Sequence, residues 1–253
     1  MKITFLGTGT STGVPQLGCD CEVCTSSNSR DRRLRTSALL EVCHDFRILF
    51  DCGPDFREQM LREGFADFRV VLITHEHYDH VGGLDDLRPY SFMRDMPVYA
   101  DSLTAKHLRE RLPYCFGERI YPGAPRLVLH EIAPGHPFDL YGVEILPLQA
   151  MHGKMPILCY RIGDMAYLTD VSSLPSETLK ALSGVKFLVV NALRKDFHHS
   201  HQTLDDAIAI ARILRPSQTY FIHMSHHMGL HDEVERGLPE GMHLAYDGLQ
   251  VLF

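Results

Sequence analysis

Short apolar runs, each bounded by polar residues or glycine, recur along the chain. Runs of this length and setting are typical of strands buried in a packed sheet. They lie at residues 1–7, 47–50, 70–73, 143–148, 165–169 and 219–222. Loops at one edge of such a sheet usually carry a protein's chemistry, so the residues that follow these runs are the first candidates for a functional site.

Segments with helical spacing alternate with these runs. Residues 204–214 are the clearest, because apolar side chains recur there every three or four residues. Thr203 with Asp206 resembles a capping box with Asp in place of Glu, and Arg215-Pro216 predicts the end of the helix. Further helices are expected at residues 54–63 with Gly64 after them, at 103–112 after Asp101 or Ser102, and from a Ser173 cap to Leu182.

The length of 253 residues fits one large α/β domain, and no linker, low-complexity segment or repeat divides the chain. We therefore expect a single domain over residues 1–253. The net charge of −7 argues against nucleic acid as the main partner. No apolar stretch reaches the roughly 18 residues of a membrane-spanning helix. The first apolar run is too short for a signal peptide, so we expect a cytoplasmic protein with reduced or metal-bound cysteines.

The most informative segment follows the run at 70–73. It reads His75-Glu76-His77-Tyr78-Asp79-His80, with three histidines and an aspartate within six residues. Imidazole nitrogen and carboxylate oxygen are ligands that zinc and similar divalent ions prefer. Ligands so closely spaced suit two neighbouring ions, with further ligands arriving from elsewhere in the chain. A surface loop that happens to be rich in histidine is the alternative.

Single histidines and aspartates at the ends of other predicted strands argue against that alternative. Asp51, Asp170 and His223 directly end or follow apolar runs, and His152 comes shortly after the run at 143–148. Strand ends at one edge of a sheet lie close together in space. These residues and the histidine loop therefore form one candidate constellation.

The order of histidine loop, later His, later Asp and last His resembles that of the metallo-β-lactamase superfamily, whose H-x-H-x-D-H motif stands at 75–80. The resemblance implies an αββα sandwich with two catalytic divalent metals, Zn or Mn, at one sheet edge. It also implies that Asp51 orients a metal-bound imidazole. The implied ligands are His75, His77 and His152 for one metal, Asp79, His80 and His223 for the other, and Asp170 for both; Asp79 is also counted as catalytic.

A second candidate metal site is Cys19-Asp20-Cys21-Glu22-Val23-Cys24. Three thiols in six residues suit a tight turn around a structural zinc. His226 is the best candidate for the fourth ligand, since it follows His223 by three residues. Independent reduced cysteines are the alternative, and we expect Cys43, Cys52, Cys115 and Cys159 to be small core residues. The polar stretch 26–33 is expected to be a surface loop.

This cysteine pattern, after an N-terminal Gly-Thr-Gly, resembles the phosphoribosyl cyclic phosphodiesterases of the phosphonate pathway. That resemblance implies a zinc held by Cys19, Cys21, Cys24 and His226. The B-type pyrroloquinoline-quinone biosynthesis proteins also carry such a cysteine site, so the element does not determine the substrate. The loop 7–15 is either a tight turn or a segment whose amides and hydroxyls approach a phosphate.

His201-Gln202-Thr203 resembles the His-x-Thr motif of the phosphodiesterase branch, in which the histidine protonates the leaving alcohol. A capping loop before the helix at 204–214 is the alternative. An alkoxide is a poor leaving group, so a general acid has a physical role in diester hydrolysis. We expect His198 and His199 beside it to face solvent.

The sequence therefore predicts a dinuclear metal-dependent phosphodiesterase in which a metal-bound hydroxide attacks phosphorus and His201 is the general acid. The expected substrate is a small or cyclic phosphodiester, such as a ribose 1,2-cyclic phosphate, and a homodimer is possible. One alternative is a transfer-RNA 3′-processing endonuclease, although the interval 152–170 is too short for the long basic arm of that family. The other is a non-hydrolytic metal-binding protein like the B-type quinone-cofactor factor.

Overall fold

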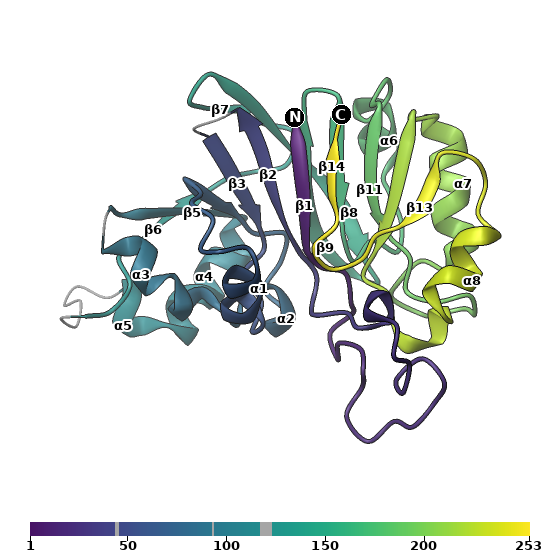
Figure 1. The fold of residues 1–253 in the computed structure, drawn as a ribbon. Coiled ribbons are helices and arrows are strands. Elements are labelled where there is room, and N and C mark those ends of the chain that lie inside the picture. The colour runs from purple at the N-terminus through teal and green to yellow at the C-terminus, as the bar shows by residue number, and fades with distance from the viewer. Residues whose placement is uncertain (44–45, 93, 117–122) are drawn as a thin grey trace.

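The computed structural model describes residues 1–43, 46–92, 94–116 and 123–253. Two mixed sheets of seven described strands each face one another (Figure 1). The first runs in the order β14 (Gln250–Leu252), β1 (Lys2–Gly7), β2 (Ser37–Cys43), β3 (Phe46–Phe50), β4 (Val70–Leu72), β5 (Met96–Ala100) and β6 (Leu127–Glu131). The second runs in the order β13 (Met242–Leu244), β12 (Gln218–Ile222), β11 (Phe187–Asn191), β10 (Met165–Leu168), β9 (Met155–Ile162), β8 (Val143–His152) and β7 (Phe138–Leu140).

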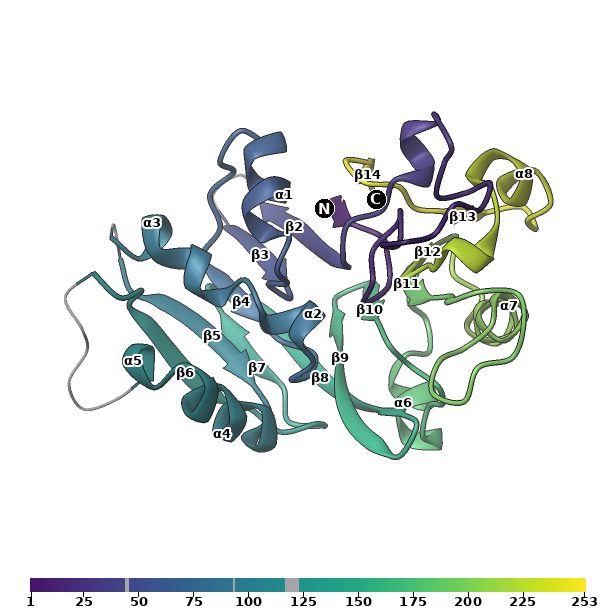
Figure 2. The same ribbon diagram turned by 90° about the horizontal axis from the view of Figure 1, so that it is seen from below.

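Helices cover the outer face of each sheet (Figure 2). The first sheet is covered by α1 (Phe56–Arg62), α2 (Tyr78–Val81), α3 (Arg88–Ser91), α4 (Ser102–Arg111) and α5 (Pro113–Phe116). The second is covered by α6 (Ser176–Ala181), α7 (Leu204–Leu214) and α8 (His231–Arg236). This layering is the αββα metallo-β-lactamase sandwich, so the predicted fold class is confirmed.

The inner faces of the two sheets share one apolar core. The ring of Phe50 on β3 stacks on that of Tyr167 on β10, with centroids 4.3 Å apart. The buried hydroxyl of Tyr160 on β9 donates to the carbonyl of Ile73, just beyond β4, at 2.6 Å. These contacts fix the position of the two sheets relative to one another close to the end of β4, after which the histidine loop begins.

Both sheets have an antiparallel half and a parallel half. β3 to β6 run parallel to one another in the first sheet, and β10 to β13 run parallel to one another in the second. Carboxyl ends of parallel strands meet at one sheet edge, where ligands commonly bind. Asp51 follows β3, His75 follows β4, Asp170 follows β10 and His223 follows β12. The architecture thus gathers the predicted strand-end residues at one edge.

Most of the predicted elements are present. α7 begins at a full capping box of Thr203 and Asp206 and ends at Arg215, as predicted. The Ser173 cap is wrong: α6 starts at Ser176 after Pro175. Ser173 is held elsewhere, because its carbonyl accepts from the Met151 amide of β8 at 3.0 Å.

The predicted core cysteines divide into two kinds. Cys52, Cys115 and Cys159 are buried as expected, but Cys43 is exposed. Cys43 is the last residue of β2, where the strand has left the core. Among the described residues, no helix is long and apolar enough to span a membrane.

Candidate metal centre

Three residues of the centre occupy tight, left-handed turns directly after buried strands. Asp51, Asp170 and His223 have φ angles of 56°, 60° and 58°. Positive φ is uncommon for residues other than glycine and is often found at functional sites. Gly53 allows the turn after β3 to pack against the histidine loop, since a Cβ there would lie 2.1 Å from the Asp79 carbonyl oxygen. The local backbone thus directs several polar side chains to one point.

Two groups of side chains converge there and share Asp170. In each group, one nitrogen or oxygen atom per residue lies within 4.8 Å of the corresponding atoms of the others. The groups are His75, His77, His152 and Asp170, and Asp79, His80, Asp170 and His223. All seven residues singled out in the sequence are therefore brought together.

The buried imidazole nitrogens that face Asp170 make no hydrogen bond. Oδ1 of Asp170 lies 3.0 Å from His223 Nδ1 and 3.3 Å from His80 Nε2, and Oδ2 lies 3.8 Å from His75 Nε2. All three nitrogens are buried without a hydrogen-bond partner among the described residues. Unpaired buried polar atoms are costly and rare. Nitrogen and carboxylate donors at these spacings fit divalent metal ions.

The opposite ring nitrogens on the first sheet are held by their neighbours. His80 Nδ1 donates to Oδ2 of the buried Asp51 at 2.7 Å, and His75 Nδ1 lies 3.0 Å from the Thr74 hydroxyl. Thr74 also donates its backbone amide to Asp51 at 2.8 Å. Hydrogen bonds of this kind fix ring orientation and leave the other nitrogen for a metal. The geometry agrees with the orienting role expected of Asp51.

The histidines of the second sheet are held in the same manner by residues that the sequence did not indicate. His223 Nε2 lies 3.0 Å from the Thr10 hydroxyl, and His152 Nδ1 donates to the Ser200 carbonyl at 2.9 Å. Thr10 belongs to the glycine- and hydroxyl-rich loop 7–15, and this loop was the only sequence feature that could have indicated the contact with His223. Nothing in the sequence pointed to the backbone of Ser200 or to Thr74.

Burial and neighbouring charges shift the pKa values of several residues in the centre. Burial raises the pKa of Asp51, and the neighbouring His80 offsets this only in part. For Asp170, burial alone would raise the pKa, but His223 and His80 outweigh it and hold the pKa well below its usual range. Burial lowers the pKa of His75 well below its usual range, with the like charge of His80 adding to the effect. An ionised Asp170 beside a neutral His75 suits metal coordination.

His201 lies against the centre without belonging to either group. Its ring centroid is 4.5 Å from that of His152 and 5.0 Å from that of His223, and its Nδ1 is 3.9 Å from Asp170 Oδ2. Burial lowers the pKa of His201 to about 3, although Asp170 opposes this. His199 is exposed as expected, but His198 is half-buried because it packs against the His201 ring.

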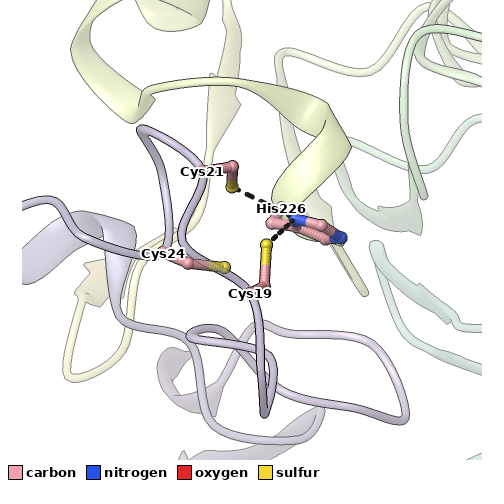
Figure 3. A group of neighbouring side chains, drawn as sticks. All are labelled: Cys19, Cys21, Cys24 and His226. Carbon is pink, nitrogen blue, oxygen red and sulfur yellow. Dashed lines mark hydrogen bonds between the residues drawn. The ribbon is translucent and has the colours of Figure 1, made fainter.

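The three cysteines and His226 form a second cluster (Figure 3). Ligand atoms of Cys19, Cys21, Cys24 and His226 lie within 4.8 Å of one another. His226 Nδ1 is 3.3 Å from the Cys19 sulfur and 3.2 Å from the Cys21 sulfur. The hydrogen bond with His226 lowers the pKa of Cys21 to about 6, while burial raises that of Cys24 to about 11. Three thiols and one imidazole are a donor set that zinc accepts.

The polar stretch that follows the cysteines is not simply a surface loop. Asp31 and Arg33 are each only 1% exposed. Arg33 donates to the carbonyls of Ser225 and Gly229, and Asp31 accepts from the backbone amide of His231 at 2.7 Å. The expectation was wrong because both side chains are buried and bond to the segment after β12. Their contacts tie the cysteine loop to the turn that carries His226.

Comparisons with known proteins agree with this architecture. The model of the Beta-lactamase superfamily domain matches residues 46–224. A solved structure described as a new diphosphatase of the PhnP family is 40% identical, with a TM-score of 0.92, over 100% of this chain and 97% of that one. Zinc-bound PqqB from Methylobacterium extorquens shares the fold at 16% identity, with a TM-score of 0.82 and full coverage of both chains.

Among curated proteins, one named octanoyltransferase from Porphyromonas gingivalis is 46% identical over 100% of this chain. That alignment covers 51% of the relative, so this chain spans about half of its length. A ribonuclease Z from Microcystis aeruginosa is 31% identical over 65% of this chain and 47% of its own. With its family model and its fold in agreement, the chain belongs to the metallo-β-lactamase superfamily, as a metal-binding hydrolase fold related to the PhnP-family diphosphatase.

Proposed function

We propose that this protein is a metal-dependent phosphodiesterase that hydrolyses small or cyclic phosphodiesters, such as a ribose 1,2-cyclic phosphate. The observation that carries the proposal is the position of His201, whose ring packs on His152 and His223 and whose Nδ1 lies 3.9 Å from the shared Asp170. A proton donor at that point is suited to a poor alcohol leaving group.

Two divalent ions, Zn or Mn, would be held by the two groups that share Asp170. Bound there, they would supply Lewis acidity toward a phosphate and lower the pKa of water. The protein's own contribution is orientation. Thr74 and Asp51 fix His75 and His80, and Asp79 completes the second group. In the same proposal Cys19, Cys21, Cys24 and His226 hold a structural zinc, and residues 1–253 act as one hydrolase domain.

His201 would act on the leaving oxygen. Before substrate binds, its low pKa keeps the imidazole neutral at pH 7. An anionic phosphodiester beside the ring favours the protonated form, which can then donate to the departing alkoxide. Thr203 and Asp206 keep the preceding loop in place, since they form the capping box of α7.

The test compares leaving groups in a His201→Ala variant. On a cyclic ribose phosphate, whose leaving group is a sugar alkoxide, kcat should fall roughly 10²- to 10⁴-fold. On bis-p-nitrophenyl phosphate, whose leaving group is stable as an anion, the loss should be much smaller. Equal losses on both substrates with full metal content would remove the proton-donor role. Lactone hydrolysis by the wild type without diester activity would remove the phosphodiesterase assignment.

A second candidate is hydrolysis of a diphosphate linkage, because the PhnP-family relative at 40% identity is described as a diphosphatase. The same variant separates the two. A phosphate leaving group needs less protonation than an alkoxide, so His201→Ala should affect a diphosphate ester less than a cyclic phosphate. A wild type that hydrolyses diphosphates but no diester would favour this candidate.

Two other functions have less support. Ribonuclease Z is among the relatives, but the interval between His152 and Asp170 holds only β9, β10 and tight turns, which leaves no place for a long RNA-binding arm. A non-hydrolytic metal-binding role is supported only by likeness to PqqB, at 16% identity over the whole fold and 35% identity over 36% of this chain. Precursor transfer RNA belongs in the substrate panel as the check on the first of these.

A further inference from the structure

The segment that joins β13 to β14 runs past β1, close to the start of the loop 7–15 (Figure 1). Asp247 lies in this segment, and its side chain is 9% exposed. Its Oδ1 accepts from the Thr8 amide at 2.9 Å and from the Thr8 hydroxyl at 2.8 Å, and its Oδ2 accepts from the Leu34 amide at 2.7 Å. One carboxylate therefore binds two segments that are distant from it in the sequence.

The loop that Asp247 holds lies along the turn that carries His223. The Thr8 carbonyl accepts from the Met224 amide at 2.9 Å, and the Thr10 amide donates to the Met224 carbonyl at 3.1 Å. The Thr10 hydroxyl is 3.0 Å from His223 Nε2. Hydrogen bonds and the short backbone between Thr8 and Thr10 thus connect Asp247 to a ring of the histidine centre.

The backbone at Gly9, in the middle of this connection, has little room to move. Its amide donates to the Leu34 carbonyl at 2.7 Å. A Cβ at Gly9 would lie 2.6 Å from the Arg33 carbonyl oxygen, so the two segments are in close contact. Because this backbone is closely packed, a displacement of Thr8 would also displace Thr10.

Asp247 is held by hydrogen bonds rather than by a close ion pair. Arg62 Nη1 lies 3.7 Å from its carboxylate, while Nε of Arg62 donates to Glu63 at 3.1 Å and Nη2 donates to the Leu6 carbonyl at 2.6 Å. Burial raises the pKa of Asp247 to about 6, although its hydrogen bonds oppose this. The carboxylate is therefore ionised at pH 8. A buried charge is costly, but a charged acceptor forms shorter and stronger hydrogen bonds, which suits a group that fixes the backbone amides it binds.

We propose that Asp247 is a positioning residue of the histidine centre. Through Thr8 it keeps the Thr10 hydroxyl against His223. That contact sets the orientation in which His223 Nδ1 faces the shared Asp170, 3.0 Å away. Hydrogen bonds to one ring nitrogen are the usual means of directing the other toward a metal. The inference concerns metal binding alone, so it holds whether the centre cleaves a phosphodiester, a diphosphate or neither.

The test measures metal affinity rather than turnover. Metal-free protein at pH 8 is titrated with Co²⁺ against a competing chelator. Cobalt bound by thiolates absorbs in the near ultraviolet, so the cysteine cluster is recorded separately from the centre. Thr10→Val should weaken binding at the centre about 10- to 100-fold and Asp247→Asn about 10-fold, as is usual for groups that support a metal ligand. Binding at the cysteine cluster should be unchanged in both variants.

A double variant decides whether Asp247 acts through Thr10. If it does, the protein with both substitutions should bind cobalt at the centre no more weakly than Thr10→Val alone, because the connection is already broken. Losses that add, as they do for independent sites, would overturn the proposal. So would wild-type affinity in Asp247→Asn. If Asp247→Asn does not fold, Thr8→Val takes its place; it should weaken binding less, and it too should add nothing to Thr10→Val.

Glu235→Gln is the matched control. Glu235 is also a carboxylate that holds backbone near Asp247, since it accepts from the Leu244 amide of β13 at 2.6 Å, and its second hydrogen bond is to His243 of the same strand. Like Asp247→Asn, Glu235→Gln should lower the melting temperature, but it should leave the affinity for cobalt at the centre unchanged. An equal loss of affinity in the two variants would show that lower stability alone explains the effect, and the positioning role would be withdrawn.

Discussion

The histidine centre and the cysteine cluster are both candidate metal sites, but the chain builds them differently. The cysteine cluster takes three donors from residues 19–24 and one from His226. The histidine centre takes its donors from the loop and short helix after β4 and from the ends of three strands of the second sheet. Four protein donors close the first site, as in structural zinc sites, whereas the second shares one carboxylate between two groups and lies beside a cavity.

This difference indicates that the two sites have separate roles, one in chemistry and one in stability. The turn after β12 carries His223 of the centre and His226 of the cluster only three residues apart. The N-terminal segment carries Thr10, which contacts His223, and Cys19, which contacts His226. A metal in the cluster would therefore hold together two segments that also orient the centre. We expect changes in the centre to abolish chemistry and changes in the cluster to weaken mainly stability.

The largest effect is expected from Asp170→Ala, because both groups lose their common donor. Activity on bis-p-nitrophenyl phosphate should fall by roughly 10³-fold or more, given that one electrostatic group alone often contributes that much. Elemental analysis should show loss of metal from the centre and retention of one ion in the cluster. Asp164→Ala is the control, since Asp164 is exposed and pairs only with Lys186. Retained activity in Asp170→Ala would contradict the shared-ligand assignment.

A smaller loss is expected from Asp51→Asn, which keeps the shape of the side chain. The substitution removes the charge that accepts from His80 Nδ1 at 2.7 Å. Changes in such supporting groups typically cost about 10- to 100-fold in metal affinity or activity. Competition with a chelator measures the affinity. An affinity equal to that of the wild type would show that the orientation of His80 does not depend on the carboxylate.

The double variant Cys19→Ser with Cys21→Ser should separate the two sites. Wild-type protein should contain close to three ions per chain and the variant close to two. The melting temperature should fall by about 5 to 10 °C, because metal binding at such sites contributes to folding. Turnover of bis-p-nitrophenyl phosphate should change by less than about threefold. Cys43→Ser, at an exposed cysteine outside the cluster, is the control. An unchanged metal content in the double variant would remove the structural-zinc assignment.

The smallest effect concerns pH in metal-free protein. The folded-state pKa of Cys21 is about 6, against an ordinary value of 9.0, because His226 hydrogen-bonds to the sulfur. Between these two values the unfolded chain binds a proton that the folded chain does not. The contribution of Cys21 to the free energy of unfolding is therefore full above pH 9 and is lost as the pH falls through about 6. Denaturant titrations of the wild type and of Cys21→Ser should show a shallower pH slope in the variant. Parallel slopes would contradict the shifted pKa.

Local patterns were sufficient for much of the fold. The capping box of Thr203 and Asp206 and the apolar spacing of 204–214 predicted α7, since both signals arise within one helix. The motif at 75–80 indicated metal ligands for the same reason, because its donors are adjacent in the chain. Prediction failed where a distant segment decided the outcome. Ser173 is held by β8, and Asp31 and Arg33 are buried by the segment after β12.

By itself, the sequence determined which residues are candidate metal ligands and which buried strands precede them, because residue type and apolar periodicity are local properties. Only the tertiary structure decided which nitrogen of each histidine faces Asp170. That choice depends on Thr10, Thr74, Asp51 and the Ser200 carbonyl, which lie at unrelated positions in the chain. Contacts between remote residues follow from packing, and packing leaves no periodic signal in the sequence.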